Sequence, residues 1–277
     1  MKRVLMCPPT FFTVRDVKNP FMEGAAAVDS DRAALQWQAV RSAFERAGVS
    51  VLTIDPVEDL EDMVFAANQT FVGSGTTHAR FIVPSRMRHP SREREVEHYV
   101  AWFERAGFEV IDIGLDSHAG QFLEGHGDLL AQPGTARVWA GFGIRSSQTG
   151  VARFAGAMRG EGIEVCAVAL VDPAFYHLDT CFAPLNAEAA LIYPDAFAPE
   201  SLRMLRQRWT RLYEVARVDA LNFACNGTVA NEWFVAAHAT PWLHDVLMRE
   251  GLRLLAVDTS EFEKAGGSVF CMKAQLD

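Results

Sequence analysis

The stretch AFERAGVSVLTID, residues 43–55, sets the pattern from which the fold of this chain can be predicted. A helical segment ends in a charged turn with a glycine, and a short apolar run follows, which is typical of an α-helix leading into a β-strand. Related stretches recur at 102–114, 157–172, 208–219 and 246–258. Five copies at this spacing indicate repeated supersecondary units and predict five-fold pseudosymmetry. Ordinary βα alternation in an open parallel sheet is the alternative, because the fourth copy lacks its glycine.

The segment before the first copy has the pattern of a helix with one buried face. Its apolar residues follow the three-and-four spacing of such a helix: Ala33, Trp37, Val40, Phe44 and Ala47. We expect Ser30 to cap the N-terminus and Gly48 to end the helix. The apolar run from Val49 onward then predicts a strand.

The composition is that of an acidic globular protein, and we expect a single domain spanning residues 1–277. The formal net charge is −9 and 49% of residues are apolar. An acidic chain does not favour nucleic acid or an anionic membrane as partner, and the arginines of 86–94 are interrupted by glutamates, which favours a solvated helix face. No apolar run reaches the length of a membrane span, and the N-terminal run is too short for a signal peptide. A cytoplasmic location is therefore expected, and the oligomeric state stays open.

Cys271 is one of five cysteines, an odd number without a CxxC pair, so a disulfide framework is not expected. It ends an apolar run after Gly266 and Gly267, and we expect this run to be a short strand. A thiol beside a glycine turn is well placed to act as a nucleophile, provided that a nearby cation or a charged substrate lowers its pKa. From the local sequence alone, a buried structural cysteine is the favoured interpretation.

Two segments carry His and acidic residues that could serve such a thiol. In HLDT, His177 and Asp179 alternate with an apolar residue, so on a strand they would share one face. His177 could act as general acid and base, and Asp179 could hold a cation. In EGHGD, Glu124 flanks a Gly-His-Gly turn. His and carboxylates this close often occur by chance, and we expect no metal site and no cofactor.

Taken together, these motifs resemble those of the guanidino-group-modifying, or amidinotransferase, superfamily. The resemblance runs from MCPPTFFTVRDVKNPFM at 6–22 to GGSVFCMKAQ at 266–275, and it includes EGHGD and HLDT in that order. It implies an α/β fold, the five-bladed α/β propeller built from ββαβ units. It also implies a site on the central axis, where loops of several blades converge.

The family's roles can be carried over to matching residues. Cys271 would attack the guanidinium carbon, His177 would shuttle protons, and Glu124 would hold both His177 and the guanidinium. Further substrate contacts are implied for Asp179 as a second clamp, for Arg145 in GFGIRSS on the α-carboxylate, and for Arg88 as a weaker candidate for the same contact.

Asn68 and Asn19 indicate which member of the superfamily the chain resembles. Deiminases and dimethylargininases carry an acid where this chain has Asn68, whereas Asn68 and the Asn19 of NPFM resemble arginine dihydrolases. Such enzymes convert arginine to ornithine, ammonia and carbon dioxide, and an amide can donate to the carbonyl oxygen of a citrulline intermediate. The alternatives are a dimethylargininase or deiminase that releases citrulline, an amidinotransferase, and a catalytically silent small-molecule sensor. The expected partner is a small guanidino compound.

Overall fold

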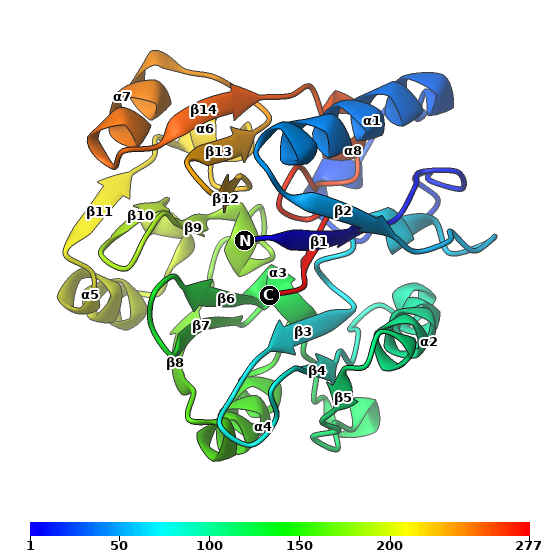
Figure 1. The fold of residues 1–277 in the computed structure, drawn as a ribbon, viewed down its shortest axis with the longest axis vertical. Helices are drawn as coiled ribbons and strands as arrows, with labels where there is room; N and C mark the ends of the chain where they lie inside the picture. The colour runs from blue at the N-terminus through cyan, green and yellow to red at the C-terminus, as the bar shows by residue number, and fades with distance from the viewer.

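Five three-stranded sheets form a ring in this computed structural model, which describes residues 1–277 (Figure 1). Each sheet is one blade. The first blade contains β15 (Ala274–Gln275), β1 (Arg3–Met6) and β2 (Ser50–Thr53). The second blade contains β3 (Thr70–Gly73), β4 (Phe81–Pro84) and β5 (Glu109–Val110). The third contains β6 (Leu129–Gln132), β7 (Arg137–Phe142) and β8 (Glu164–Ala169). The fourth blade contains β9 (Phe182–Pro184), β10 (Ala189–Ile192) and β11 (Arg211–Glu214). The fifth contains β12 (Thr228–Ala230), β13 (Trp233–Ala236) and β14 (Arg253–Ala256).

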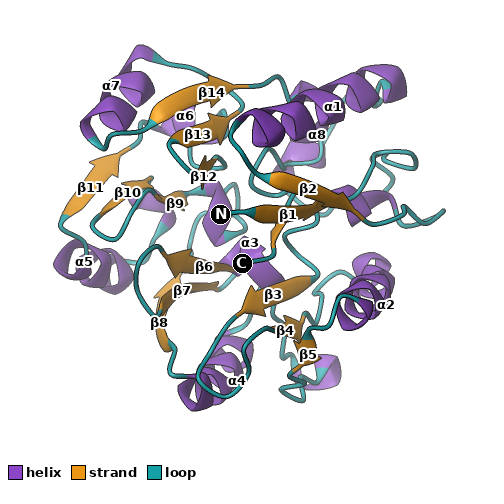
Figure 2. Cartoon of the chain, in the orientation of Figure 1, coloured by secondary structure: helices purple, strands orange, loops and turns teal.

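Every blade repeats one topology. The first two strands are antiparallel, and the second and third are parallel. A parallel pair needs a crossover, which is a helix in each blade. These helices are α1 (Ser30–Arg46), α2 (Pro90–Arg105), α4 (Gln148–Met158), α5 (Pro199–Arg208) and α7 (Pro241–Arg249). They lie around the outside of the ring, as Figure 2 shows.

The sequence repeat therefore corresponds to the blades. Each of the five copies begins at or near the end of a crossover helix and runs into the third strand of its blade, which confirms the predicted five-bladed α/β propeller. The N-cap prediction was wrong by one residue. Asp29, not Ser30, accepts a hydrogen bond from the first helical turn, at 3.0 Å from the Arg32 amide nitrogen. Gly48 has φ 76°, a conformation that suits glycine after a helix end.

The ring closes between the two ends of the chain. β15 pairs antiparallel with β1, and the Asp277 carboxylate accepts from the Lys2 amide at 2.9 Å.

Three short helices complete the chain: α3 (Gly125–Asp128), α6 (Arg217–Leu221) and α8 (Ser260–Glu263). α3 lies near the middle of the ring in Figure 1. None of the helices combines the length and the apolar character needed to cross a membrane.

The arginine-rich stretch on α2 differs from its expected solvated face. Arg92 points inward and is only 4% exposed. Its guanidinium is paired with buried carboxylates, which is the usual condition for burying a charge.

Candidate active site

A narrow cavity lies where loops of several blades meet. It offers about 10 Å³, roughly the room for one water molecule. Its lining includes five of the eight site residues predicted from the sequence: Asn19, Asn68, Arg145, His177 and Cys271.

Cys271 is held at the cavity by contacts from two other blades. Its thiol lies 3.0 Å from Asp179 Oδ2 and 3.2 Å from the Asn226 amide nitrogen, which donates to the sulfur. The expected strand at this position is absent. Residues 269–272 form a turn, and its amide groups bond to Asn226 instead of to a strand partner.

Asp179 is a buried carboxylate with only part of its bonding capacity used. Oδ2 accepts from the Cys271 thiol, whereas Oδ1 is buried without a hydrogen-bond partner. Burial raises the pKa of Asp179 to about 7, although the bonds to Cys271 and Asn226 act in the opposite direction. Burial, followed by the charge of Asp179, also raises the pKa of the Cys271 thiol well above its usual value. A cation in this space would favour ionisation of both groups.

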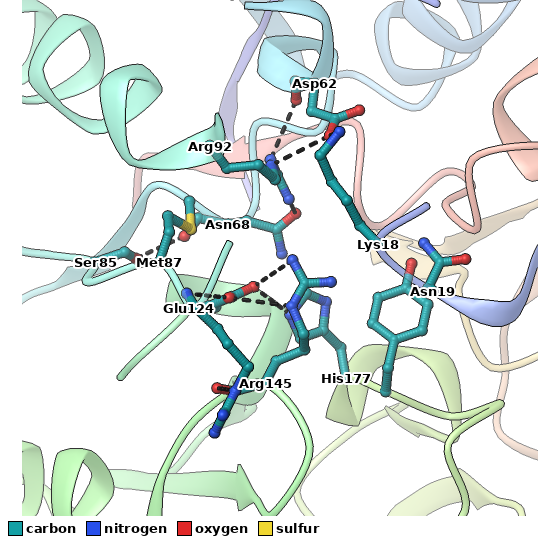
Figure 3. A network of polar contacts seen from close by, with 12 residues as sticks. Lys18, Asn19, Asp62, Asn68, Ser85, Met87, Arg92, Glu124, Arg145 and His177 are labelled. Carbon is teal, nitrogen blue, oxygen red and sulfur yellow. Dashed lines mark hydrogen bonds and ion pairs between the residues drawn. The ribbon is translucent and has the colours of Figure 1, made fainter. Parts of the chain in front are cut away.

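Glu124 has the opposite environment. Oε2 lies 2.8 Å from His177 Nε2 and 3.0 Å from Arg145 Nη2, and Oε1 accepts from Arg145 Nε at 3.1 Å and from the Arg88 amide at 2.9 Å (Figure 3). Burial acts to raise the pKa of Glu124, but Arg145 and His177 outweigh it and hold the pKa well below its usual value. Glu124 thus fixes the His177 ring by its contact with Nε2, and Nδ1 lies on the other side of the ring.

His177 and Asp179 do not share a strand face. Residues 178–180 form a 3₁₀ turn, and His177 precedes it in extended conformation. The turn separates the two side chains, so that His177 reaches Glu124 and Asp179 reaches Cys271. His177 and Asp179 therefore contact different partners, although they are only two residues apart in the chain.

The two arginines predicted for the substrate carboxylate are placed differently. Arg145 lines the cavity, and its Nη2, which lies beside Glu124, makes no aligned hydrogen bond. Arg88 does not line the cavity. Its Nε donates to the Arg145 carbonyl at 2.9 Å, and its guanidinium lies over the Phe122 ring at 4.7 Å. Arg145 is thus the better placed of the two.

The two asparagines also differ. Both polar atoms of the Asn19 amide have a partner, because Oδ1 accepts from the Phe21 amide at 3.0 Å and Nδ2 donates to the Ala265 carbonyl at 2.9 Å. Asn68 has Oδ1 at 3.1 Å from Arg92 Nη1, while its Nδ2 is buried without a partner. Of the two amide nitrogens, only that of Asn68 makes no hydrogen bond.

His126 and Asp128 of the EGHGD motif make structural contacts. Asp128 accepts from the Ser146 hydroxyl at 2.6 Å and from the Leu178 amide at 3.0 Å, and it thereby ties the Glu124 segment to the His177 segment. His126 Nε2 accepts from the Val72 amide at 3.0 Å, and burial lowers its pKa to about 3. No group of three or more His, Cys, Asp or Glu side chains could hold a metal ion.

Sequence reasoning missed four residues of this centre. Asn226 donates to the Cys271 sulfur, and Tyr176 donates to the Gly266 carbonyl at 2.6 Å and packs beside His177. Lys273 is fully buried with Nζ over the Phe270 ring, and burial lowers its pKa to about 7. Arg92 reaches Asn68 from α2. Of these four residues, only Lys273 could have been noticed from the sequence. It lies two residues after Cys271 in an apolar run, where a lysine is unusual and suggests a buried charge.

Comparisons with known proteins agree with this fold. The profile of the eukaryotic N,N-dimethylarginine dimethylhydrolase family matches residues 11–277. The chain therefore belongs to this family of the guanidino-group-modifying superfamily.

Several relatives have named activities. The chain is 34% identical to the bifunctional arginine dihydrolase/ornithine cyclodeaminase ArgZ of Synechocystis, with 99% of the chain and 37% of ArgZ covered. It is 34% identical to the N(G),N(G)-dimethylarginine dimethylaminohydrolase of Mycobacterium tuberculosis, with 99% of the chain and 86% of that enzyme covered. The chain thus spans little more than a third of the cyanobacterial enzyme.

Solved structures extend the comparison. The N-terminal domain of ArgZ, as a cysteine-to-serine variant bound to substrate, superposes with a TM-score of 0.90 at 33% identity, with 99% of this chain and 97% of that chain covered. A dimethylarginine dimethylaminohydrolase adduct superposes with a TM-score of 0.79 at 20% identity, covering 98% of each chain, and supports the fold alone.

Proposed function

We propose that this chain is a cysteine hydrolase of free L-arginine that carries out two successive hydrolyses as an arginine dihydrolase. The observation that carries the proposal is the free amide donor of Asn68 beside the cavity that holds Cys271 and His177. The ArgZ relative with that activity supports it. We further propose that residues 1–277 act as one catalytic domain in the cytoplasm.

In the first hydrolysis, the Cys271 sulfur attacks the guanidino carbon. The guanidinium of the substrate brings a positive charge next to Asp179 and Cys271. This charge favours the thiolate form of Cys271. His177, held by Glu124 through Nε2, protonates the departing amine from Nδ1. A covalent thiouronium remains, and water activated by His177 releases citrulline and restores the thiol. Arginine and water thus give citrulline and ammonia.

In the second hydrolysis, the Cys271 sulfur attacks the ureido carbon of the bound citrulline, and ammonia departs with a proton from His177. Water then cleaves the carbon–sulfur bond, which restores the thiol, and the N-carboxy product loses carbon dioxide to give ornithine. The ureido group of citrulline is neutral and carries a carbonyl oxygen, to which a carboxylate cannot donate but the Asn68 amide can. Citrulline and water thus give ornithine, carbon dioxide and ammonia. No cofactor enters either step, and Arg145 remains our proposed contact for the substrate carboxylate.

Release of citrulline from arginine or dimethylarginine is the second candidate, supported by the mycobacterial relative. The test is incubation of the purified protein with L-arginine, asymmetric dimethylarginine and citrulline, each separately, with ammonia, amine, citrulline and ornithine followed. Ornithine from arginine is the expected result. Citrulline as end product would overturn the dihydrolase proposal, and no turnover would favour transfer to an amine acceptor or a sensor.

Cys271→Ser separates an enzyme from a sensor. We expect turnover to fall by at least about 10⁴-fold, the scale of losing a catalytic nucleophile, while arginine binding remains measurable by calorimetry. A protein whose biological output survived this substitution would be a sensor.

A further inference from the structure

Lys273 is a buried lysine without an acidic side chain in contact with its ammonium group. The residue is 1% exposed, and its Nζ lies 3.7 Å from the centre of the Phe270 ring. It forms no ion pair or hydrogen bond with another side chain, whereas the buried Arg92 and Arg145 are each paired with a carboxylate. Removing an ammonium from water costs free energy, which the face of one aromatic ring offsets only in part. Stability alone therefore does not explain a lysine at this position.

The charge of Lys273 is coupled to the pair formed by Asp179 and Cys271. Burial lowers the pKa of Lys273 to about 7, against the charges of Asp179 and Cys271, which act to raise it. Burial raises the pKa of Asp179, and the Lys273 ammonium acts in the opposite direction. Asp179 Oδ2 lies 3.0 Å from the Cys271 sulfur, so the three groups titrate together. Lys273 does not line the cavity, and its charge therefore acts on a substrate only through this pair.

His126 on α3 is the other titratable side chain that the charge of Lys273 affects. Burial, followed by the charge of Lys273, lowers the pKa of His126 to about 3, so its ring is neutral near neutral pH. The ring already accepts from the Val72 amide through Nε2. His126 thus supplies no charge, and the balance around Lys273 is left to Asp179, Cys271 and a ligand in the cavity.

The charge of the ligand changes what this buried group must compensate. With arginine bound, the Asp179 carboxylate and a Cys271 thiolate face one cation, the guanidinium. With citrulline bound, the ligand is neutral, and the same two anions have no cation beside them unless Lys273 carries a proton. Two adjacent anions without a cation disfavour ionisation of the thiol. An amine with a pKa of about 7 can be protonated or neutral near neutral pH, so Lys273 is able to adjust.

We propose that Lys273 is a positioning residue whose ammonium replaces the substrate cation when the ligand is neutral, so that the Cys271 thiolate also forms beside a ureido group. This deepens the proposed function, because only a second hydrolysis requires Cys271 to attack a neutral ligand. When a guanidinium enters instead, repulsion between the two cations favours loss of the Lys273 proton. Lys273 therefore matters more for citrulline than for arginine.

The test is alkylation of Cys271 near neutral pH by two reagents of similar size, neutral 2-chloroacetamide and cationic 2-chloroacetamidine. Peptide mass spectrometry follows the label on Cys271. Lys273→Met should slow the neutral reagent about tenfold and the cationic reagent less than threefold, because a nearby positive charge favours the thiolate by about one pH unit. Lys273→Arg keeps the charge and should retain the rate with the neutral reagent. Lys2→Met removes an exposed lysine and, as the matched control, should change neither rate.

Equal slowing of both reagents in Lys273→Met would indicate altered access to Cys271 and would overturn the proposal, as would unchanged rates. Should Lys273→Met fail to fold, Lys273→Gln is used with the same expectations.

Turnover gives a second measurement. Lys273→Met should lower kcat/KM for citrulline about tenfold and for arginine less than threefold, so that citrulline accumulates from arginine. Equal losses for the two substrates would contradict the role of Lys273. A parent protein that itself stops at citrulline would contradict the dihydrolase proposal alone, because the alkylation rates are measured without substrate.

Discussion

Glu124 and Asp179 are two fully buried carboxylates in the same centre, yet their surroundings are opposite. Both oxygens of Glu124 are taken by Arg145, His177 and a backbone amide, and its pKa is held well below the usual value. Asp179 makes no ion pair, has one unpartnered oxygen, and has its pKa raised to about 7. Glu124 is thus already paired with cationic groups, whereas Asp179 has no cationic partner, and we propose that a cationic ligand supplies one.

The largest expected effect comes from neutralising the framework carboxylate. Glu124→Gln leaves Arg145 buried without its counter-charge, so we expect the free energy of unfolding to fall by about 3–5 kcal/mol, as for other broken buried pairs. The loss of the His177 anchor should lower kcat/KM for arginine by about 10³-fold. Chemical denaturation and steady-state kinetics check both numbers. Unchanged stability would mean that Glu124 does not hold Arg145 electrostatically.

Asp179→Asn should separate activity from stability. We expect kcat/KM for arginine to fall about 10²-fold, because the guanidinium loses its ion pair. Since the pKa of Asp179 is raised, the folded state favours its protonated form, and its stabilising contribution is lost as pH rises from about 4 through about 7. The asparagine variant should therefore unfold at a higher temperature than the parent at pH 8 but not at pH 4. A lower melting temperature of Asp179→Asn than of the parent at pH 8 would contradict the contrast drawn between Asp179 and Glu124.

The pH dependence of kcat/KM offers a smaller effect. Asp179 faces the Cys271 thiol, Asn226 and the nearby charge of Lys273, and its pKa of about 7 puts its ionisation near neutrality. Because a protonated Asp179 cannot pair with guanidinium, kcat/KM should fall about tenfold per unit as pH drops below 7. In Asp179→Asn this acidic limb should be lost, and an identical limb in both proteins would assign it to another group.

The smallest effect is expected from Arg88. Its side chain contacts the Arg145 carbonyl and the Phe122 ring, whereas its contact with Glu124 uses only the backbone. Arg88→Met should therefore change KM for arginine less than threefold, and Arg145→Met should raise it by about 10²-fold or more. A large rise in KM for Arg88→Met would make Arg88 the carboxylate ligand.

The fold could be predicted from the sequence because its signal is repeated. Each blade buries the same helix-to-strand pattern, so five weak local signals at regular spacing reinforce one another. The predicted strands that would carry Cys271 and His177 were wrong, because these segments are turns fixed by distant side chains such as Asn226 and Asp128. Such contacts join residues far apart in the chain and have no local periodicity.

The site was predicted through resemblance, and five of its eight residues line one cavity, but their hydrogen-bond and ion-pair partners could not be predicted. The pattern at 86–94 shows alternating charges, which normally indicates a solvated face. Arg92 is buried because acids from other parts of the chain neutralise it, and this depends on three-dimensional packing.

The closing of the ring by β15 has a consequence for the order in which the protein becomes active during synthesis. Cys271 lies three residues before β15, and β15 completes the blade that β1 began. A ribosome-bound chain interrupted before residue 271 would lack both Cys271, the proposed nucleophile, and the last strand of its first blade. Translation of one short segment thus supplies the cysteine and the ring-closing strand together.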